Sequence, residues 1–156
     1  MSNNKRIAVI GIGNEFRGDD AVGIVVARHF NTLDPRVFVK APVSDAAALI
    51  NAMTGANAAF IIDCAHSDYD AGFIYRFNYP HDPIPEKLFP GYSTHYMKLT
   101  SALATAKELG CLPARLIIYG IVGKNLEHGE PLSPDVAAAA EKVISEIDAE
   151  IRRLLD

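Results

Sequence analysis

A buried strand, a glycine turn and a helix follow one another within the first 33 residues. The apolar run Ile7–Ile12 is typical of a buried strand, and Gly11 and Gly13 predict a tight turn at its end. From about Asp20 to Leu33, apolar residues recur at helical spacing. Strand-like and helix-like patterns alternate in this way along the rest of the chain, which predicts an α/β layered fold.

The remaining elements complete one expected domain that spans residues 1–156. Ser44 and Ser133 are each expected to cap the N-terminus of a helix. The pattern predicts a three-layer αβα sandwich around a twisted, mostly parallel sheet of about five strands. The other expected strands are 37–40, 58–63, 72–79 and 115–122, and the other expected helices are 44–53, 97–109 and 134–155.

Composition excludes several classes of protein. The net charge is −4 and the chain has no cluster of lysine or arginine, which argues against a nucleic acid or an anionic membrane as the main partner. The sequence shows neither a signal peptide nor an apolar run long enough to span a bilayer, so we expect a cytoplasmic protein. Cys64 and Cys111 lack metal-binding spacing and are expected to be buried thiols.

Polar side chains follow three of the expected elements at positions where ligands gather in α/β sheets. Glu15, Asp19 and Asp20 follow the first strand, Asp63 ends the third, and His95 precedes the third helix in Ser93-Thr94-His95. The carboxyl ends of parallel strands meet at one edge of the sheet, so two carboxylates and an imidazole could converge there. Such a set of oxygen and nitrogen ligands suits a borderline divalent metal with open coordination positions.

Each of these residues also has a purely structural interpretation. Asp19 or Asp20, taken alone, is better explained as a helix cap; Asp63 could accept hydrogen bonds from a loop, and His95 could simply open a helix. The turn lacks the third glycine of a dinucleotide fingerprint, because Phe16 stands in its place. His66, three residues after Asp63, could join the site or point to solvent.

Three segments together resemble the hydrogenase maturation endopeptidases, which process nickel–iron hydrogenases. The family's opening signature stands here as Gly11–Gly23, its apolar strand ending in aspartate as Phe60–Asp63, and its Ser-x-His element as Ser93–Leu99. Two positions depart from the pattern. A Gly-Gly-Thr-like turn is replaced by Lys40–Asp45, and the glycine after the acidic pair is Ala21.

The resemblance implies a metal-dependent, aspartic-type endopeptidase that removes a C-terminal extension from a hydrogenase large-subunit precursor after nickel insertion. Carried over by position, the metal ligands and catalytic residues are Asp20, Asp63 and His95. The expected ion is Ni²⁺, either resident or supplied by the precursor, with Cd²⁺ or Zn²⁺ as substitutes. Asp19 is then the expected helix cap, and Glu15 has no ligand role. A monomer is expected, and the proline-rich loop 80–92 is a candidate wall of the substrate groove.

Two alternatives remain at the level of sequence. The chain could be a metal-sensing or chaperone module that binds the precursor without cutting it. It could also be a small-molecule-binding α/β domain in which the acids only cap helices. Metal binding and release of a peptide are the observations that separate the three hypotheses.

Overall fold

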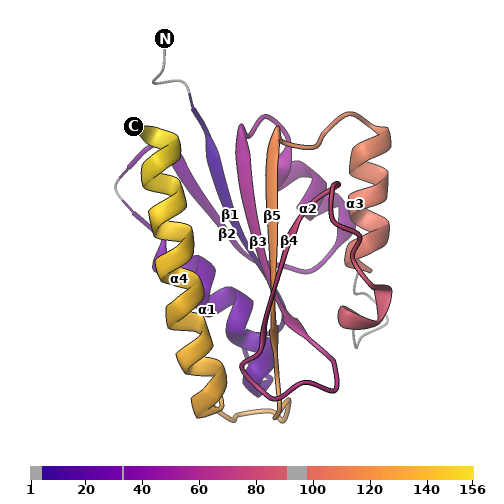
Figure 1. Cartoon of the computed structure of the whole chain (residues 1–156), viewed down its shortest axis with the longest axis vertical. Helices are drawn as coiled ribbons and strands as arrows, with labels where there is room; N and C mark the ends of the chain where they lie inside the picture. The colour runs from indigo at the N-terminus through magenta and orange to yellow at the C-terminus, as the bar shows by residue number, and fades with distance from the viewer. Residues whose placement is uncertain (1–4, 33, 91–97) are drawn as a thin grey trace.

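The computed structural model describes residues 5–32, 34–90 and 98–156. One five-stranded sheet in the order β2-β1-β3-β5-β4 forms its centre (Figure 1). Four strands are parallel, and β4 pairs antiparallel with β5 at one edge. The strands are β1 (Ile7–Ile12), β2 (Val37–Val43), β3 (Ala58–Ala65), β4 (Ile74–Asn78) and β5 (Arg115–Val122). The helices are η2 (Gly18–Ala21), α1 (Val22–His29), α2 (Ala46–Met53), η3 (Glu86–Leu88), α3 (Leu99–Glu108) and α4 (Pro134–Leu155).

Helices cover both faces of the sheet, as expected for a three-layer αβα sandwich. Figure 1 shows α1 and α4 on one side of the sheet and α2 and α3 on the other. Each side has its own core cluster, because alternate side chains of β1, β3 and β5 point to opposite faces. Every residue of β1 is buried, as predicted for an apolar run at the centre of a parallel sheet. Within the described ranges, no helix combines the length and hydropathy that a membrane span requires.

Some element boundaries differ from the prediction for local reasons. The first helix begins as the 3₁₀ turn η2 and its α-helical part ends at His29, so the predicted range to Leu33 was too long. Strand β2 continues beyond Lys40 to Val43, where it pairs with Ile12 beyond an irregularity in the β1–β2 register. Asp45, not Ser44, caps α2 by accepting a hydrogen bond of 2.8 Å from the Ala48 amide.

Glycines allow α1 to begin directly against the sheet. A Cβ atom at Gly23 would overlap the carbonyl oxygens of Ile62 and Ile12, and one at Gly11 would overlap the carbonyl of Gly23. The backbone of the first helical turn therefore contacts the backbone of β1 and β3. This contact brings the acidic residues before α1 close to the end of β3.

The close contact predicts a large loss of stability for Gly23→Ala. Because the added methyl group meets backbone atoms, which cannot rotate away, we expect the free energy of unfolding to fall by about 3 kcal/mol. Urea denaturation would measure the loss. Gly110→Ala is the control, since Gly110 has a positive φ but no heavy atom within 4 Å of an added Cβ; it should cost only about 1 kcal/mol. Equal losses in the two variants would contradict the argument.

Candidate functional site

Asp20 and Asp63 lie at the carboxyl edge of the sheet, where β1 and β3 are neighbours. The chain leaves β1 toward α1 on one face and returns to β3 from α2 on the other, so a topological switch point lies between these strands, where α/β proteins bind ligands. Gly11 pairs with Ile62, which places Asp63 beside the last residue of β1. The Asp20 carboxyl lies beside Gly13, because a Cβ atom there would be 3.7 Å from Asp20 Cγ.

The pKa values of both carboxyl groups lie above their usual value. Burial raises the pKa of Asp63 well above its usual value, and the negative charge of Asp20 raises it further, against one hydrogen bond from the Cys64 amide. Burial also raises the pKa of Asp20, which accepts a hydrogen bond of 3.0 Å from the Asn14 amide. Both side chains keep some contact with solvent. The site thus holds two like charges that repel each other where a ligand can reach them.

Asp19 has a different role from the one predicted for it. Its side chain is fully buried and makes no capping bond to η2 or α1, so the assignment as the cap of its own helix was wrong. It accepts four hydrogen bonds of 2.6–2.8 Å, from the amides of Lys124, Asn125 and Ser133 and from the Ser133 hydroxyl. Asp19 therefore joins the turn after β1 to the loop between β5 and α4.

Hydrogen bonding also determines the charge state of Asp19. Burial by itself raises the pKa of this carboxyl, but bonds from the amides of Asn125, Ser133 and Lys124 and from the Ser133 hydroxyl outweigh it, so the pKa lies below its usual value. Ser133 occupies the N-cap position of α4 as predicted, yet its hydroxyl bonds to Asp19 and not to the helix.

The charge of Arg17 acts on both Asp20 and His66. The charge of Arg17 lowers the pKa of Asp20, and it also lowers the pKa of His66, which burial lowers more strongly. His66 is half-buried and its amide donates to the carbonyl of Leu88. Sequence patterns did not identify Arg17, since only the folded turn brings it toward the end of β3.

The other candidate residues divide into two groups. Glu15 pairs with Arg28 at 2.8 Å on the surface, which explains its charge without a ligand. His95 and its neighbours Ser93 and Thr94 lie outside the described residues, so the third expected ligand has no structural description. Among the residues that are described, no group of three His, Cys, Asp or Glu side chains could hold a metal ion. Cys64 and Cys111 are free thiols; Cys64 is buried as predicted, whereas Cys111 is only partly buried.

The proline-rich loop is described over residues 80–90, and its end packs against the sheet while most of its other residues are exposed. Leu88 and Phe89 are buried, the Leu88 carbonyl accepts the His66 amide at 2.9 Å, and the Phe89 ring lies against Gly120. The segment therefore covers the carboxyl end of β3 and β5 on the α3 side. This position agrees with a wall beside Asp63.

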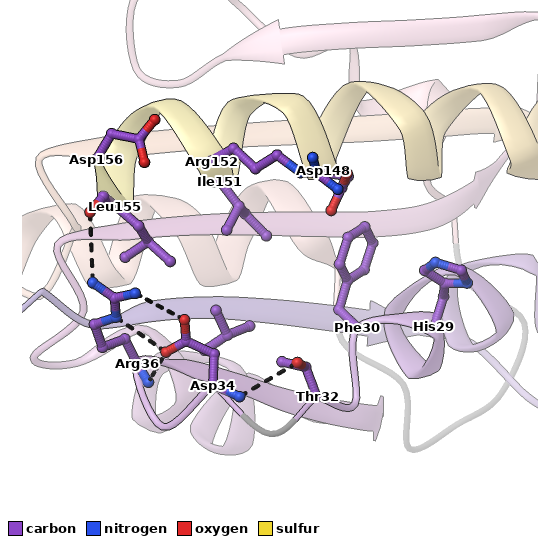
Figure 2. A pocket seen from close by; sticks show the side chains of 11 residues that line it. His29, Phe30, Thr32, Asp34, Arg36, Asp148, Ile151, Arg152, Leu155 and Asp156 are labelled. Carbon is purple, nitrogen blue, oxygen red and sulfur yellow. Dashed lines mark hydrogen bonds and ion pairs between the residues drawn. The ribbon is translucent and has the colours of Figure 1, made fainter.

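A separate cavity of about 440 Å³ lies where α1 and α4 end and β2 begins, at the opposite edge of the sheet (Figure 2). The guanidinium of Arg36 binds Asp34 at 2.9 and 3.0 Å and is 3.5 Å from the Leu155 carbonyl. Arg152 pairs with Asp148 at 3.0 Å. The charged side chains of Arg36 and Arg152 are thus paired with carboxylates, in contrast to the neighbouring carboxyl groups of Asp20 and Asp63.

Comparison with known proteins identifies the family of this chain. A family model described as HycI, hydrogenase maturation protease, matches residues 44–150. A Methanocaldococcus jannaschii protein, provisionally named as a hydrogenase maturation protease, is 29% identical over 93% of this chain and 88% of its own length. The structure of the maturating endopeptidase HybD from Escherichia coli covers 95% of this chain and 93% of its own, with 23% identity and a TM-score of 0.78. HybD from Thermococcus kodakarensis covers 94% and 98%, with 25% identity and a TM-score of 0.67.

The chain belongs to the hydrogenase maturation protease family, because the family model matches more than half of it. This confirms the resemblance inferred from its sequence motifs. The fold prediction is also confirmed, since the five-stranded, mostly parallel sheet with helices on both faces matches the HybD structure.

Proposed function

We propose that this protein is an endopeptidase that removes the C-terminal extension of a nickel–iron hydrogenase large-subunit precursor after nickel insertion. Asp20 and Asp63 bind the metal-bearing end of the substrate, and His95 is the third proposed ligand. The observation that carries the proposal is the pair of neighbouring carboxylates at the switch point of a chain that belongs to this protease family.

The donor set fits a divalent cation. Burial raises the pKa of both carboxyl groups, and the charge of Asp20 raises the pKa of Asp63 further; a cation between the two groups would relieve this repulsion. Oxygen ligands from two carboxylates, together with one imidazole nitrogen, suit Ni²⁺ and leave coordination positions open. A bound divalent cation would supply Lewis acidity toward a peptide carbonyl or a water molecule.

Backbone amides orient the proposed ligands, and Asp19 holds the turn that carries one of them. Asp63 accepts a hydrogen bond at Oδ1 from the Cys64 amide, and Asp20 accepts one at Oδ2 from the Asn14 amide, so each carboxyl group is oriented by the backbone. Asp19 holds the turn that carries Asp20. If the nickel arrives with the precursor, a precursor without nickel would leave the carboxylates unpaired and would bind weakly. Cleavage would therefore depend on prior insertion of nickel.

Calorimetric titration with Ni²⁺ or Cd²⁺ tests the proposed metal site. We expect Asp20→Asn, Asp63→Asn and His95→Ala each to weaken binding by at least about tenfold, since each removes a ligand. Glu15→Gln is the matched control, because it removes a charge from the same turn but leaves the proposed ligands in place. Unchanged affinity in the first three variants would show that the site is wrong.

A further inference from the structure

The connection from β3 to β4 exposes aromatic side chains at the carboxyl edge of the sheet. Tyr69 is 59% exposed and Phe73 is 42% exposed. Their rings stack at a centroid distance of 4.4 Å, and the series continues to Tyr75 at 4.9 Å from Phe73 and to Phe77 at 6.0 Å from Tyr75. We call these four residues the aromatic ladder. Tyr75 and Phe77 pack against the core on the α3 side of the sheet, whereas Tyr69 and Phe73 form the exposed half of the ladder.

The exposed half of the ladder lies at the same edge of the sheet as the candidate site. The Val122 amide donates to the Phe73 carbonyl at 2.9 Å, and the Gly72 amide donates to the Val122 carbonyl at 2.8 Å. Val122 pairs in turn with Ala65, two residues beyond Asp63 on β3. The ladder therefore begins two strands away from Asp63 at the same edge, and it follows β4, the last strand of the sheet.

The chain segment that leads into the ladder carries only negative charge. From Asp63 to Tyr75 the sequence contains three carboxylates and neither lysine nor arginine. Asp68 and Asp70 are both exposed and flank Tyr69 in the sequence. The next cation, Arg76, bonds to Glu150 at 3.1 Å and to the Tyr119 hydroxyl at 3.3 Å, in the layer on the α4 side of the sheet. Aromatic faces attract cations, and nearby carboxylates strengthen that attraction.

We propose that Tyr69 and Phe73, with Asp68 and Asp70, form a docking surface for a segment of the hydrogenase precursor that carries lysine or arginine. This proposal rests on the proposed function for the identity of the partner. Charge complementarity selects the occupant. A cationic side chain gains from both the stacked rings and the two carboxylates, whereas a second copy of this chain would bring like charges together. Because β4 is an edge strand, an extended segment can pair with it and end at the carboxyl edge of the sheet, which also carries Asp63.

Binding of the nickel-free precursor to the wild-type protein, measured by calorimetry, tests the surface without turnover, because all three proposed ligands stay in place and a precursor without nickel is not expected to be cleaved. We expect the double substitution Tyr69→Ala and Phe73→Ala to weaken binding by about tenfold, and Asp68→Lys with Asp70→Lys to weaken it at least as much. Leu109→Ala is the control, because Leu109 is 64% exposed at the opposite edge of the sheet. Substituting glutamate for lysine or arginine in the precursor segment should restore binding to the Asp68→Lys, Asp70→Lys variant.

Two results would overturn the surface proposal. One is unchanged affinity in both double variants; the other is self-association of the wild type in sedimentation experiments that Tyr69→Ala and Phe73→Ala abolish. A different result would reject the proposed function. Weakened binding in these variants, combined with no cleavage by the wild-type protein, would support the docking surface and reject the endopeptidase.

Discussion

Replacing Asp19 with asparagine is expected to lower the free energy of unfolding by about 3 kcal/mol or more, although the side chains have nearly the same shape. Both oxygens of Asp19 accept hydrogen bonds: Oδ1 from the Ser133 amide, and Oδ2 from the Ser133 hydroxyl and the amides of Lys124 and Asn125. The side-chain amide of asparagine can take two orientations that exchange its oxygen and nitrogen atoms. In both, its NH₂ group faces a buried backbone N–H, so two donors meet without an acceptor. Urea denaturation at pH 7 would measure this loss.

Ser133→Ala provides the graded control for Asp19. It removes only the hydroxyl bond and leaves the three backbone amides on the carboxylate, so it should cost about 1 kcal/mol. The pH dependence has a definite sign. Because the pKa of Asp19 is lowered in the folded state, its contribution is present above the usual value of 3.8 and is lost as the pH falls below it. A loss in Asp19→Asn no larger than in Ser133→Ala would contradict a structural role for this carboxylate.

Asp63→Asn is expected to have opposite effects on stability and function. Without divalent ions, the free energy of unfolding of Asp63→Asn should be about 1 kcal/mol higher than that of the wild type. The substitution removes a buried charge that Asp20 repels. Metal binding and precursor cleavage should be lost in the same variant. Thermal or urea denaturation in the presence of a chelator would measure the gain in stability.

The pH dependence of this second effect follows from the raised pKa of Asp63. A carboxyl whose folded pKa is raised favours the folded state below its unfolded value, and that advantage is lost as the pH rises through the folded pKa. The stability difference between Asp63→Asn and the wild type should therefore increase as the pH rises above 4. Asp82→Asn is a control for the general loss of an acid. A less stable Asp63→Asn protein at pH 7 would contradict the repulsion between Asp20 and Asp63.

Periodicity was sufficient to predict the sheet and most helices. Strand β1 and strand β5 have the predicted limits, because a central strand buried on both faces is a continuous apolar run between turn residues. Helix α4 is also as predicted, since its long apolar face packs on the sheet. The predicted end of the first helix was wrong because apolar spacing continues to Leu33, while the α-helical hydrogen bonds end near Phe30.

The candidate site could be predicted only in part. The sequence placed Asp20 and Asp63 at strand ends, and the parallel pairing of β1 with β3 brings them together. The role of Asp19 depends on Lys124, Asn125 and Ser133, more than 100 residues away, and no local pattern signals such a contact. Local sequence suggested that Asp19 caps a helix, whereas in the structure its carboxylate accepts hydrogen bonds from the loop between β5 and α4. The pairing of Glu15 with Arg28 likewise depends on the folded turn.

Mass spectrometry of a nickel-loaded hydrogenase large-subunit precursor after incubation with this protein is the most direct test. We expect one C-terminal peptide to be released by the wild-type protein and by Glu15→Gln, and none to be released by Asp20→Asn or Asp63→Asn. The same precursor without nickel should stay intact. An intact nickel-loaded precursor after incubation with the folded wild-type protein would contradict the proposed endopeptidase activity.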